Sequence, residues 1–584
     1  MRWRIEKPKE SIVCDDFRDH SDRLEMSGEQ VSAVISYAAP GGILSLRRQF
    51  AFPTFRTHPD NTHASYQPED GAPALALGEE RLLRVRFDGT LQLFCETGDL
   101  SVTHLLYPSA TLPIFYEELT IRNNAAVELS FPVENCRFDN RLCCAGRVVA
   151  ERICEQNSVV LAPGEEKTLR FAYLARFADG DIPAESEPLL FRRARVRELM
   201  SECDLTTGDD LVDTAFAFAK LRAGESLFRT AGGLIHCPGG LSYYAAVWCN
   251  DQCEYAAPWF AFTGDRKAME AAETSFRWYE RYMDDEYHPI PSSIISEGRD
   301  FWNGAGDRGD ASMYLYGLCR YLLTAGKLPD AGQERALRWC AEYIDRQITP
   351  EGIVASDTDE LENRISSGIN LNTSALTYGG WGAYAMLLRR MGREAEAANY
   401  ERRREALAAA MGAYFGGSVS GYETYHYHKG CDVIRAWNCL PVYMGIADRA
   451  EGTLAAIDTL LWKDGSCRST EGEQTLWDRS ALYYIAALFR AGKADLGWAR
   501  LREYAENRLL GEHVPYPVEA YPEGNGRHLS AESALFCRIV TDGLFGIEAG
   551  ESVAPRLTPR LPAAVSTATL RRVFFGGEYR DITI

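Results

Sequence analysis

The pattern of apolar and polar positions changes once along the chain. Up to about residue 190, apolar and polar residues alternate in short segments that turn residues separate, as in RLLRVRF and KTLRFAYLARF. Alternation with a period of two predicts strands that bury one face. Eight or more such segments predict an antiparallel β-sandwich domain over residues 1–188. A charged linker helix is expected over 189–206, and beyond it the apolar positions follow a helical period.

The helical part is predicted to consist of paired helices. Five short joints place a glycine at the end of an apolar helix and a charged helix start directly after it: FTGDRKAME, LTAGKLPDA, RRMGREAEA, MGIADRAEG and FRAGKADLG. The connections between these pairs are long, so short and long connections alternate. Twelve helices in six such hairpins predict a closed (α/α)6 toroid over 207–548, with an open solenoid as the alternative. We expect the apolar helices in the inner ring, their charged partners in the outer ring, and a short C-terminal β segment over 549–584.

Composition narrows the function classes. The chain has 63 Lys and Arg against 83 Asp and Glu, a net charge of −20, which argues against nucleic acid and anionic membranes as partners. We find no apolar run of membrane-spanning length and no secretion signal at the N-terminus. The 16 cysteines are scattered without a CxxC pair, so we expect reduced thiols, no zinc site and a cytoplasmic protein. No cofactor motif is found, and we expect none to be needed.

The long connections carry the candidate chemistry. They are rich in Tyr, Trp, Asp, Glu, Arg and His, as in GGLSYYAAVWCNDQ and HVPYPVEAYPEGNGRHLSAES. Aromatic faces cover the C–H face of a sugar ring, while charged groups form paired hydrogen bonds to its hydroxyls. In a toroid these connections meet at one end, where they lead into the inner helices. Paired carboxylates across such a pocket are what glycoside hydrolysis uses.

Three of these connections resemble known enzymes. Trp248-Cys249-Asn250-Asp251 is similar to a Trp-x-Arg-Asp motif, with Asn250 in place of the Arg; DELE at 359–362 is followed by SSGINLNTSAL; and Glu519 opens EAYPEGNG. Together with the order of the helices, they resemble the six-hairpin glycosidases, a group with glucoamylases, trehalases, amylo-α-1,6-glucosidases, α-L-rhamnosidases and related phosphorylases. The resemblance covers nearly the whole chain, since many members carry a β-sandwich before the toroid.

The resemblance implies a general acid in the 357–362 segment. Glu362 takes that position when the Asp-x-x-Glu spacing is matched, and Glu360 is its closest rival, followed by Asp357 and Asp310. A general acid must stay protonated near neutral pH, which requires burial or a neighbouring carboxylate. The alternative for these aspartates is to cap a local turn.

The resemblance implies a general base before the last inner helix, and Glu519 is the candidate. A salt bridge to Arg527 is the structural alternative for this side chain. Glu523 and Glu532 are rivals, although Glu532 also suits the first turn of a helix, where a carboxylate offsets the helix dipole.

Side chains of the same connections are the substrate-binding candidates: Trp248, Asp251, Glu254, Trp302, Asp307, Arg308, Asp310, Tyr425, His426, Trp437, Trp477, Arg479 and His528. Helix capping is the alternative for Asp251 and Glu254, and an ion pair with Asp307 is the alternative for Arg308. His426 and His428 have the spacing of a metal pair, but no third ligand follows at matched spacing, so we expect no metal there.

We therefore expect an exo-acting, inverting glycoside hydrolase that releases a terminal sugar from a small carbohydrate or glycoside. One alternative is a disaccharide phosphorylase, with Arg364, Arg527 and His528 as the phosphate pocket. Another is an epimerase or lyase that uses Tyr425, His426 and His428, and a third is a carbohydrate-binding protein without catalysis. The sequence predicts neither the sugar nor the oligomeric state.

Overall fold

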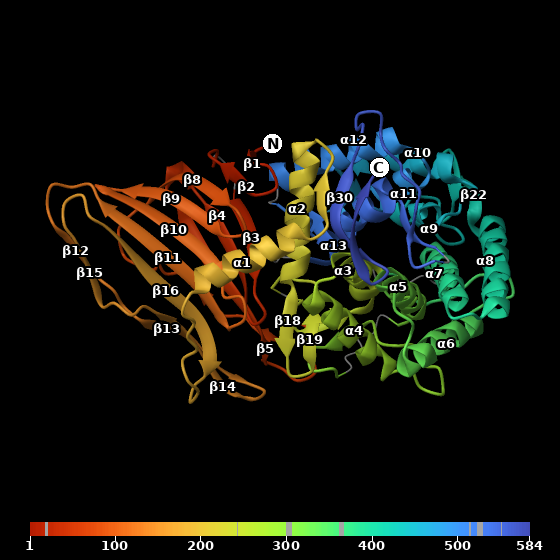
Figure 1. The fold of residues 1–584 in the computed structure, drawn as a ribbon, viewed down its shortest axis with the longest axis horizontal. Helices are drawn as coiled ribbons and strands as arrows, with labels where there is room; N and C mark the ends of the chain where they lie inside the picture. The colour runs from red at the N-terminus through yellow and green to blue at the C-terminus, as the bar shows by residue number, and fades with distance from the viewer. Residues whose placement is uncertain are drawn as a thin grey trace.

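The protein is described by a computed structural model that covers the chain except residues 18–20, 242, 300–305, 361–366, 513–514, 522–529 and 551. A β-rich part occupies one side of the molecule and a helical part the other (Figure 1). The helix α1 (Pro188–Ser201) connects them and contacts both β10 of the first part and α2 of the second. This arrangement confirms the fold class expected from the sequence, an antiparallel sandwich followed by a toroid.

The β-rich part consists of two antiparallel sheets. Within the described residues the larger sheet has nine strands in the order β1 (Arg4–Lys7), β2 (Ser11–Cys14), β8 (Arg81–Phe87), β9 (Leu91–Thr97), β10 (Leu100–Pro108), β11 (Ile114–Asn123), β16 (Glu166–Phe177), β14 (Gly146–Ile153) and β13 (Cys136–Cys143). The other sheet contains β3 (Ser21–Ser27), β4 (Ser32–Ala38), β5 (Ser45–Arg56), β6 (Ser65–Tyr66) and β7 (Glu69–Asp70). A separate pair joins β12 (Leu129–Pro132) to β15 (Ser158–Leu161).

Alternation explains why these segments form a sandwich. In β9 every second side chain from Leu91 to Thr97 is buried, while the residues between them are half-buried or exposed. Most buried positions of the strands join one hydrophobic core, while Tyr107, Ile114, Tyr116 and Leu174 form a small separate cluster. Burying one face in this way stabilises each strand against its partner sheet.

The helical part contains an inner ring of helices. In the described residues the inner ring is formed by the π-helical turn η2 (Asp251–Ala256) continuing into α3 (Ala257–Thr263), and by α5 (Asp310–Ala325), α7 (Leu371–Arg390), η3 (Ala436–Cys439) with α9 (Leu440–Met444), α11 (Asp478–Arg490), and α13 (Ser530–Arg538) with η5 (Ile539–Leu544). Successive inner helices contact one another, and α13 contacts η2 and α3. The ring is therefore closed, which confirms the toroid and excludes the open solenoid.

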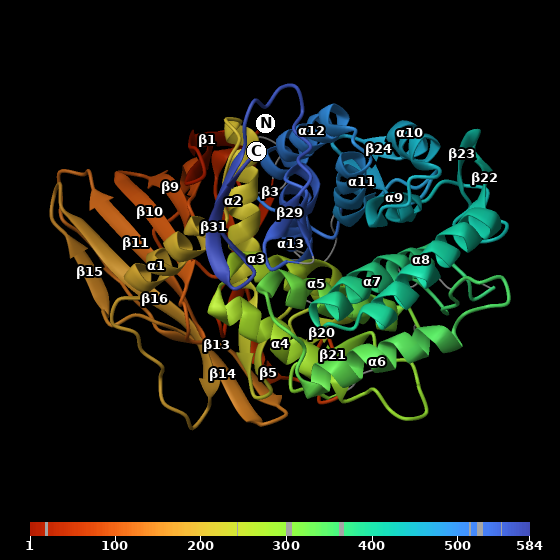
Figure 2. The same ribbon diagram turned by 45° about the vertical axis from the view of Figure 1, so that its right-hand side comes forward.

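The outer helices alternate with the inner ones along the chain (Figure 2). They are α2 (Asp210–Glu225), α4 (Arg266–Glu280), α6 (Ala331–Arg346), α8 (Glu394–Phe415), α10 (Ala450–Leu460) and α12 (Ala494–Glu503), which η4 (Tyr504–Glu512) extends. Nearly all of α2 is buried, unlike a typical outer helix, because it lies against α1 and α13. No helix of the described residues is long and apolar enough to cross a membrane.

The glycine joints form as the sequence predicts. Gly264 ends α3 with a φ of 66° and donates its N–H to the Phe260 carbonyl. Only a left-handed backbone allows this cap, which favours glycine. The outer helix α4 then starts directly, with the Asp265 side chain accepting from the Ala268 N–H. Local chemistry therefore produces the sharp reversal between an inner helix and its outer partner.

The linker differs from its expected length. The helix α1 ends at Ser201, and β17 (Asp204–Thr206) follows it. Cys203 has a φ of 43°, a left-handed conformation that cannot continue an α-helix. β17 pairs with β30 (Thr569–Phe575), which pairs with β31 (Glu578–Thr583), so the C-terminal segment folds back onto the linker.

Short strand pairs order the long connections. They are β18 (Leu227–Thr230) with β19 (Gly233–His236), β20 (Ala246–Trp248) with β21 (Ser293–Ile295), and β22 (Gly416–Val419) with β23 (Tyr422–Tyr425), whereas β28 (Ile547–Ala549) with β29 (Pro555–Leu557) follows the last inner helix. A four-stranded sheet in the described residues joins β24 (Trp462–Lys463), β25 (Ser466–Arg468), β26 (Leu476–Trp477) and β27 (Ala520–Tyr521). These pairings hold the segments that lead into the inner helices.

Candidate active site

Carboxylates gather at the N-terminal ends of the inner helices. Asp251 is the first residue of η2, Asp310 the first of α5, and Asp478 the first of α11, while Glu532 lies in the first turn of α13. A helix N-terminus carries partial positive charge and stabilises a carboxylate placed there. Because inner and outer helices alternate in direction, these ends meet on one side of the ring.

Arg479 is the centre of this cluster. Its guanidinium is buried and contacts three carboxylates: Nη2 lies 2.6 Å from Glu532 Oε1 and 3.2 Å from Asp251 Oδ1, and Nη1 lies 3.2 Å from Glu360 Oε2. Each carboxylate comes from a different segment of the chain. The guanidinium also lies over the ring of Tyr255, with its carbon 5.0 Å from the ring centre. One positive charge thus faces three buried acids.

The imbalance of charge is reflected in the pKa values. Burial raises the pKa of Asp251 to about 7, and the charges of Glu519 and Glu360 add to this while Arg479 opposes it. Burial likewise raises the pKa of Glu532 to about 8, against Arg479. The pKa of Glu360 is also raised by its burial. The cluster therefore holds protons near neutral pH, which is what general acid catalysis requires.

Glu360 has one engaged oxygen and one open oxygen. Tyr255 donates its hydroxyl to Oε2, and Asn250 Nδ2 lies 3.5 Å from the same atom. Oε1 is buried and has no hydrogen-bond partner among the described residues. A buried carboxyl group with an open oxygen is suited to carry a proton. Glu362, the first choice for the acid, lies outside the described residues.

Glu519 lies close enough to act electrostatically on the same cluster. It is half-buried and directly precedes β27, which pairs with β26 through Ala520 and Trp477. Its negative charge contributes to the raised pKa of both Asp251 and Glu532. The structure therefore brings the base candidate and Glu360 to one group of acids around Arg479. The rival Glu523 and the possible partner Arg527 lie outside the described residues.

Glu254 is a further buried acid in the ring. It lies one turn after Asp251 and accepts a hydrogen bond from the Tyr483 hydroxyl of α11. Its Oε1 is buried without a hydrogen-bond partner among the described residues. Burial, with the charge of Glu360, raises its pKa well above the usual range. The alternative of a helix cap is not what this side chain does, because it joins two inner helices instead.

Arg308 pairs with Asp310 rather than with Asp307. Nη2 of Arg308 lies 3.0 Å from Asp310 Oδ1 and 3.4 Å from Asn250 Oδ1. Asp307 instead accepts from the Tyr343 hydroxyl at 2.7 Å and from the Gly309 N–H at 2.8 Å. The alternative of an Arg308–Asp307 ion pair is therefore wrong. Asn250, which replaces the arginine of the resembling motif, bridges Arg308 and Glu360.

Aromatic residues pack against the segments that carry the cluster. Trp248 ends β20 and makes an edge contact with Tyr243 at 5.3 Å between ring centres. His63, from the sandwich connection between β5 and β6, lies 5.9 Å from Trp248. Trp437 makes an edge contact with Tyr483 at 5.7 Å. The β-sandwich therefore supplies part of this wall, which the sequence left open.

The remaining candidates form no hydrogen bond or ion pair with Arg479 among the described residues. Tyr425 is buried, and His426 is half-buried with Nδ1 2.9 Å from the Cys431 carbonyl oxygen. Among the described residues, no group with metal-binding geometry includes His426. Trp477 is half-buried and lies two residues before Arg479. Other candidates lie outside the described residues: Trp302, Arg364 and His528.

The sequence analysis underrated Glu532 and missed two tyrosines of the site. Glu532 was considered mainly as a charge that offsets the α13 dipole, but it also accepts a hydrogen bond of 2.6 Å from Arg479 Nη2. Tyr255 and Tyr483 were not singled out at all. Tyr255 follows Asp251 by one helical turn, and Tyr483 follows Arg479 by the same spacing, so both face the ring interior with their neighbours.

Comparison with known proteins identifies the fold. No family model matches the chain, and no curated protein matches it. Among solved structures, a bacterial glucoamylase complexed with acarbose has a TM-score of 0.55 at 11% identity, covering 90% of this chain and 97% of that one. A putative kojibiose phosphorylase from the human microbiome has a TM-score of 0.56 at 9% identity, covering 100% and 95%. A sialidase has a TM-score of 0.50 at 10% identity, covering 99% and 61%. The chain thus has the fold of the six-hairpin glycosidases.

Proposed function

We propose that the chain is a glycoside hydrolase whose active site is the carboxylate cluster around Arg479. The observation that carries this proposal is the convergence of Asp251, Glu360 and Glu532 on one guanidinium, with Glu519 beside them. The glucoamylase-like fold supports it, since that neighbour is complexed with acarbose. The substrate is a small carbohydrate or glycoside, and no cofactor takes part. The sixteen free thiols support a cytoplasmic location.

Glu360 is the proposed general acid. It is buried, its pKa is raised, and its Oε1 has no partner among the described residues, so a protonated Oε1 can donate a hydrogen bond to the glycosidic oxygen. A protonated carboxyl at this place delivers its proton to the glycosidic oxygen as the bond to the anomeric carbon breaks. Glu362, two residues further along, is the alternative, and both are tested together below.

Glu519 is the proposed general base. It takes a proton from a water molecule, which attacks the anomeric carbon from the face opposite to the leaving group. This sequence inverts the anomeric configuration and needs the two carboxyl groups about 6.5–9.5 Å apart. The long connections that surround the N-terminal ends of the inner helices favour release of one terminal sugar.

Phosphorolysis is the nearest alternative, since one structural neighbour is named as a putative phosphorylase. A phosphate nucleophile needs cationic side chains that are not already neutralised. Arg479 contacts three carboxylates and Arg308 contacts Asp310, so these two cations are already engaged. Among the described residues hydrolysis therefore has the better support, while Arg364, Arg527 and His528 lie outside them.

The test is a panel of aryl glycosides, assayed with and without phosphate. The variants are Glu360→Gln, Glu362→Gln and Glu519→Gln, with Glu351→Gln as a matched control because Glu351 is an exposed acid in the same connection as Glu360. We expect phosphate-independent turnover that falls by about 10²-fold or more in Glu519→Gln and in one acid variant. The control should keep full activity.

Two results contradict the proposal. Turnover that requires phosphate and survives Glu519→Gln would identify a phosphorylase and remove the base assignment. Loss of turnover in Glu362→Gln, together with full activity in Glu360→Gln, would assign the acid role to Glu362. Product analysis by NMR at early times gives the anomer released, and a retained anomer would exclude inversion.

A further inference from the structure

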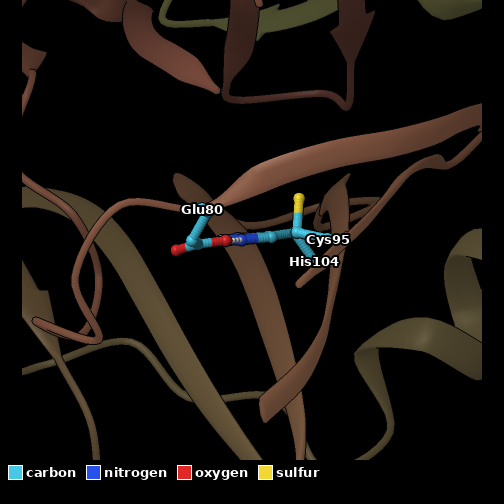
Figure 3. A group of neighbouring side chains, drawn as sticks. All are labelled: Glu80, Cys95 and His104. Carbon is cyan, nitrogen blue, oxygen red and sulfur yellow. Dashed lines mark hydrogen bonds and ion pairs between the residues drawn. The ribbon is translucent and has the colours of Figure 1, made fainter. Parts of the chain in front are cut away.

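A second cluster of chemically active side chains lies inside the β-sandwich. Glu80 lies just before β8, Cys95 on β9 and His104 on β10, and one ligand atom of each lies within 4.8 Å of the others. Figure 3 shows Glu80 and His104 end to end, with Cys95 beside the imidazole. Cys95 and His104 are buried, and Glu80 retains a small exposed fraction of 11%. This cluster plays no part in the proposed active site.

The imidazole is oriented by a second acid behind it. His104 Nδ1 lies 2.7 Å from Glu117 Oε1, and Glu117 is held in turn by Arg48, with two contacts of 2.9 Å, and by the Tyr173 hydroxyl at 2.7 Å. A carboxylate behind the distal nitrogen fixes the tautomer and ring orientation of a metal-binding histidine. Nε2 therefore points toward Glu80, and Cys95 lies beside the ring.

We propose that Glu80, Cys95 and His104 bind one divalent transition metal ion through Oε2, Sγ and Nε2. A set of one thiolate, one imidazole and one carboxylate suits Zn²⁺, with a water molecule as fourth ligand in a tetrahedral site. The three ligands come from neighbouring positions of one sheet, so the ion would join the connection before β8 to β9 and β10. Its role is structural, and it is independent of the proposed hydrolase activity.

Charge balance favours the exchange of protons for metal. Without metal, Arg48 and a doubly protonated His104 balance Glu80 and Glu117, and Cys95 is a neutral thiol. Binding one divalent ion releases one proton from His104 Nε2 and one from the Cys95 thiol. Two positive charges enter and two leave, so the buried cluster keeps the same net charge and avoids the penalty of an unpaired charge.

The geometry needs only a small adjustment. Glu80 Oε2 lies 2.6 Å from His104 Nε2, whereas two ligands of a tetrahedral zinc lie about 3.3 Å apart given bond lengths of about 2.0–2.1 Å. Glu80 therefore has to move back by less than about 1 Å. Its side chain reaches solvent at the edge of the sandwich, which leaves room for this movement and a path for the ion.

The sequence offers no short spacing for this site. In the sheet Cys95 pairs with Val102, which makes His104 its diagonal neighbour on the same face. Glu80 comes from the start of the preceding strand. The expectation of no zinc site rested on the absence of closely spaced ligands, and strand pairing brings distant ones together instead.

The test is a cobalt titration of the full chain after treatment with a chelator. It is done in a Cys144→Ser background, since Cys144 is an exposed thiol. We expect a thiolate-to-cobalt charge-transfer band that saturates at one equivalent and disappears when Zn²⁺ is added. Cys95→Ala and His104→Ala should remove the band, and Cys154→Ala, a buried thiol of the same sandwich outside the cluster, should retain it.

Zinc should also raise the melting temperature of the parent protein but not of Cys95→Ala. If His104→Ala does not fold, Cys95→Ala decides, because it removes only a small buried side chain. A parent protein without the band, or a band that survives in folded Cys95→Ala, overturns the proposal. Neither result bears on the aryl-glycoside assay, so the two proposals fail separately.

Discussion

Replacing Arg479 by methionine tests the electrostatics of the proposed active site. Methionine has a similar length and no charge, so Asp251, Glu360 and Glu532 lose their common counter-charge. All three are at most 5% exposed and cannot exchange the lost contact for water. Removing one partner of a buried ion pair typically destabilises a protein by about 3–5 kcal/mol.

The size of this effect depends on pH with a defined sign. The pKa of Asp251 is raised to about 7 and that of Glu532 to about 8, so both groups are protonated at about pH 5 and ionise as the pH approaches 8. A carboxyl group whose folded pKa is raised favours the folded state at low pH and loses this advantage as the pH rises through the folded pKa. Arg479 opposes that loss. Its removal should therefore cost about 1–2 kcal/mol at pH 5 and about 3–5 kcal/mol at pH 8.

The assay is urea unfolding of parent and variant at several pH values, followed by tryptophan fluorescence. Arg490→Met is the matched control, because Arg490 lies near the other end of α11 and pairs with Glu548, whose pKa is lowered to about 2 by its arginine partners in spite of burial. Glu548 stays ionised throughout this range, so the control should show a shift in midpoint that does not change with pH. An Arg479→Met shift of equal size at both ends of the range would refute the reasoning.

Three further predictions concern the wall, the ring and the joints. His63→Ala should raise KM for a glycoside with little change in kcat, measured by steady-state kinetics, because the ring adjoins Trp248 rather than the acids; a fall in kcat alone would contradict this. Glu254→Gln should leave the melting temperature near neutral pH almost unchanged, since its raised pKa keeps the group protonated; a loss of several degrees would show that the group is ionised. Gly264→Ala should destabilise the chain by well over about 1 kcal/mol in urea unfolding, because a Cβ there would lie under 3 Å from two C-terminal side chains. The control Gly492→Ala, whose Cβ would meet nothing within 4 Å, should cost only about 1 kcal/mol. Equal losses of stability in the two variants would contradict the packing argument.

The fold was predictable because its determinants are local. A glycine such as Gly264 ends a helix through its own backbone, and the following Asp265 starts the next one, so nine residues of sequence contain a complete joint. The strands of the sandwich are equally readable from alternation. The end of α1 was missed because Cys203 takes a left-handed conformation that no residue pattern announces.

The site was predictable only in part, since its contacts join distant segments. Arg479 and Asp251 were candidates one by one, but their contact spans more than two hundred positions of sequence. For Glu532, the first turn of a helix offered a complete local explanation and hid the contact with Arg479. Burial is likewise a tertiary property, so the raised pKa values had no counterpart in the residue pattern.

The architecture explains how so many acids tolerate one another. A closed ring of inner helices brings its N-termini to one side, and each carries roughly half a positive charge from its aligned peptide groups. These partial charges and Arg479 together stabilise the ionised forms of Asp251 and Glu532, while burial and mutual repulsion oppose ionisation. The balance leaves pKa values near neutrality, where a carboxyl group can give up and regain a proton at similar cost. The direction of the helices in a toroid of hairpins thus gathers these acids at one end of the ring, and their burial there raises their pKa values.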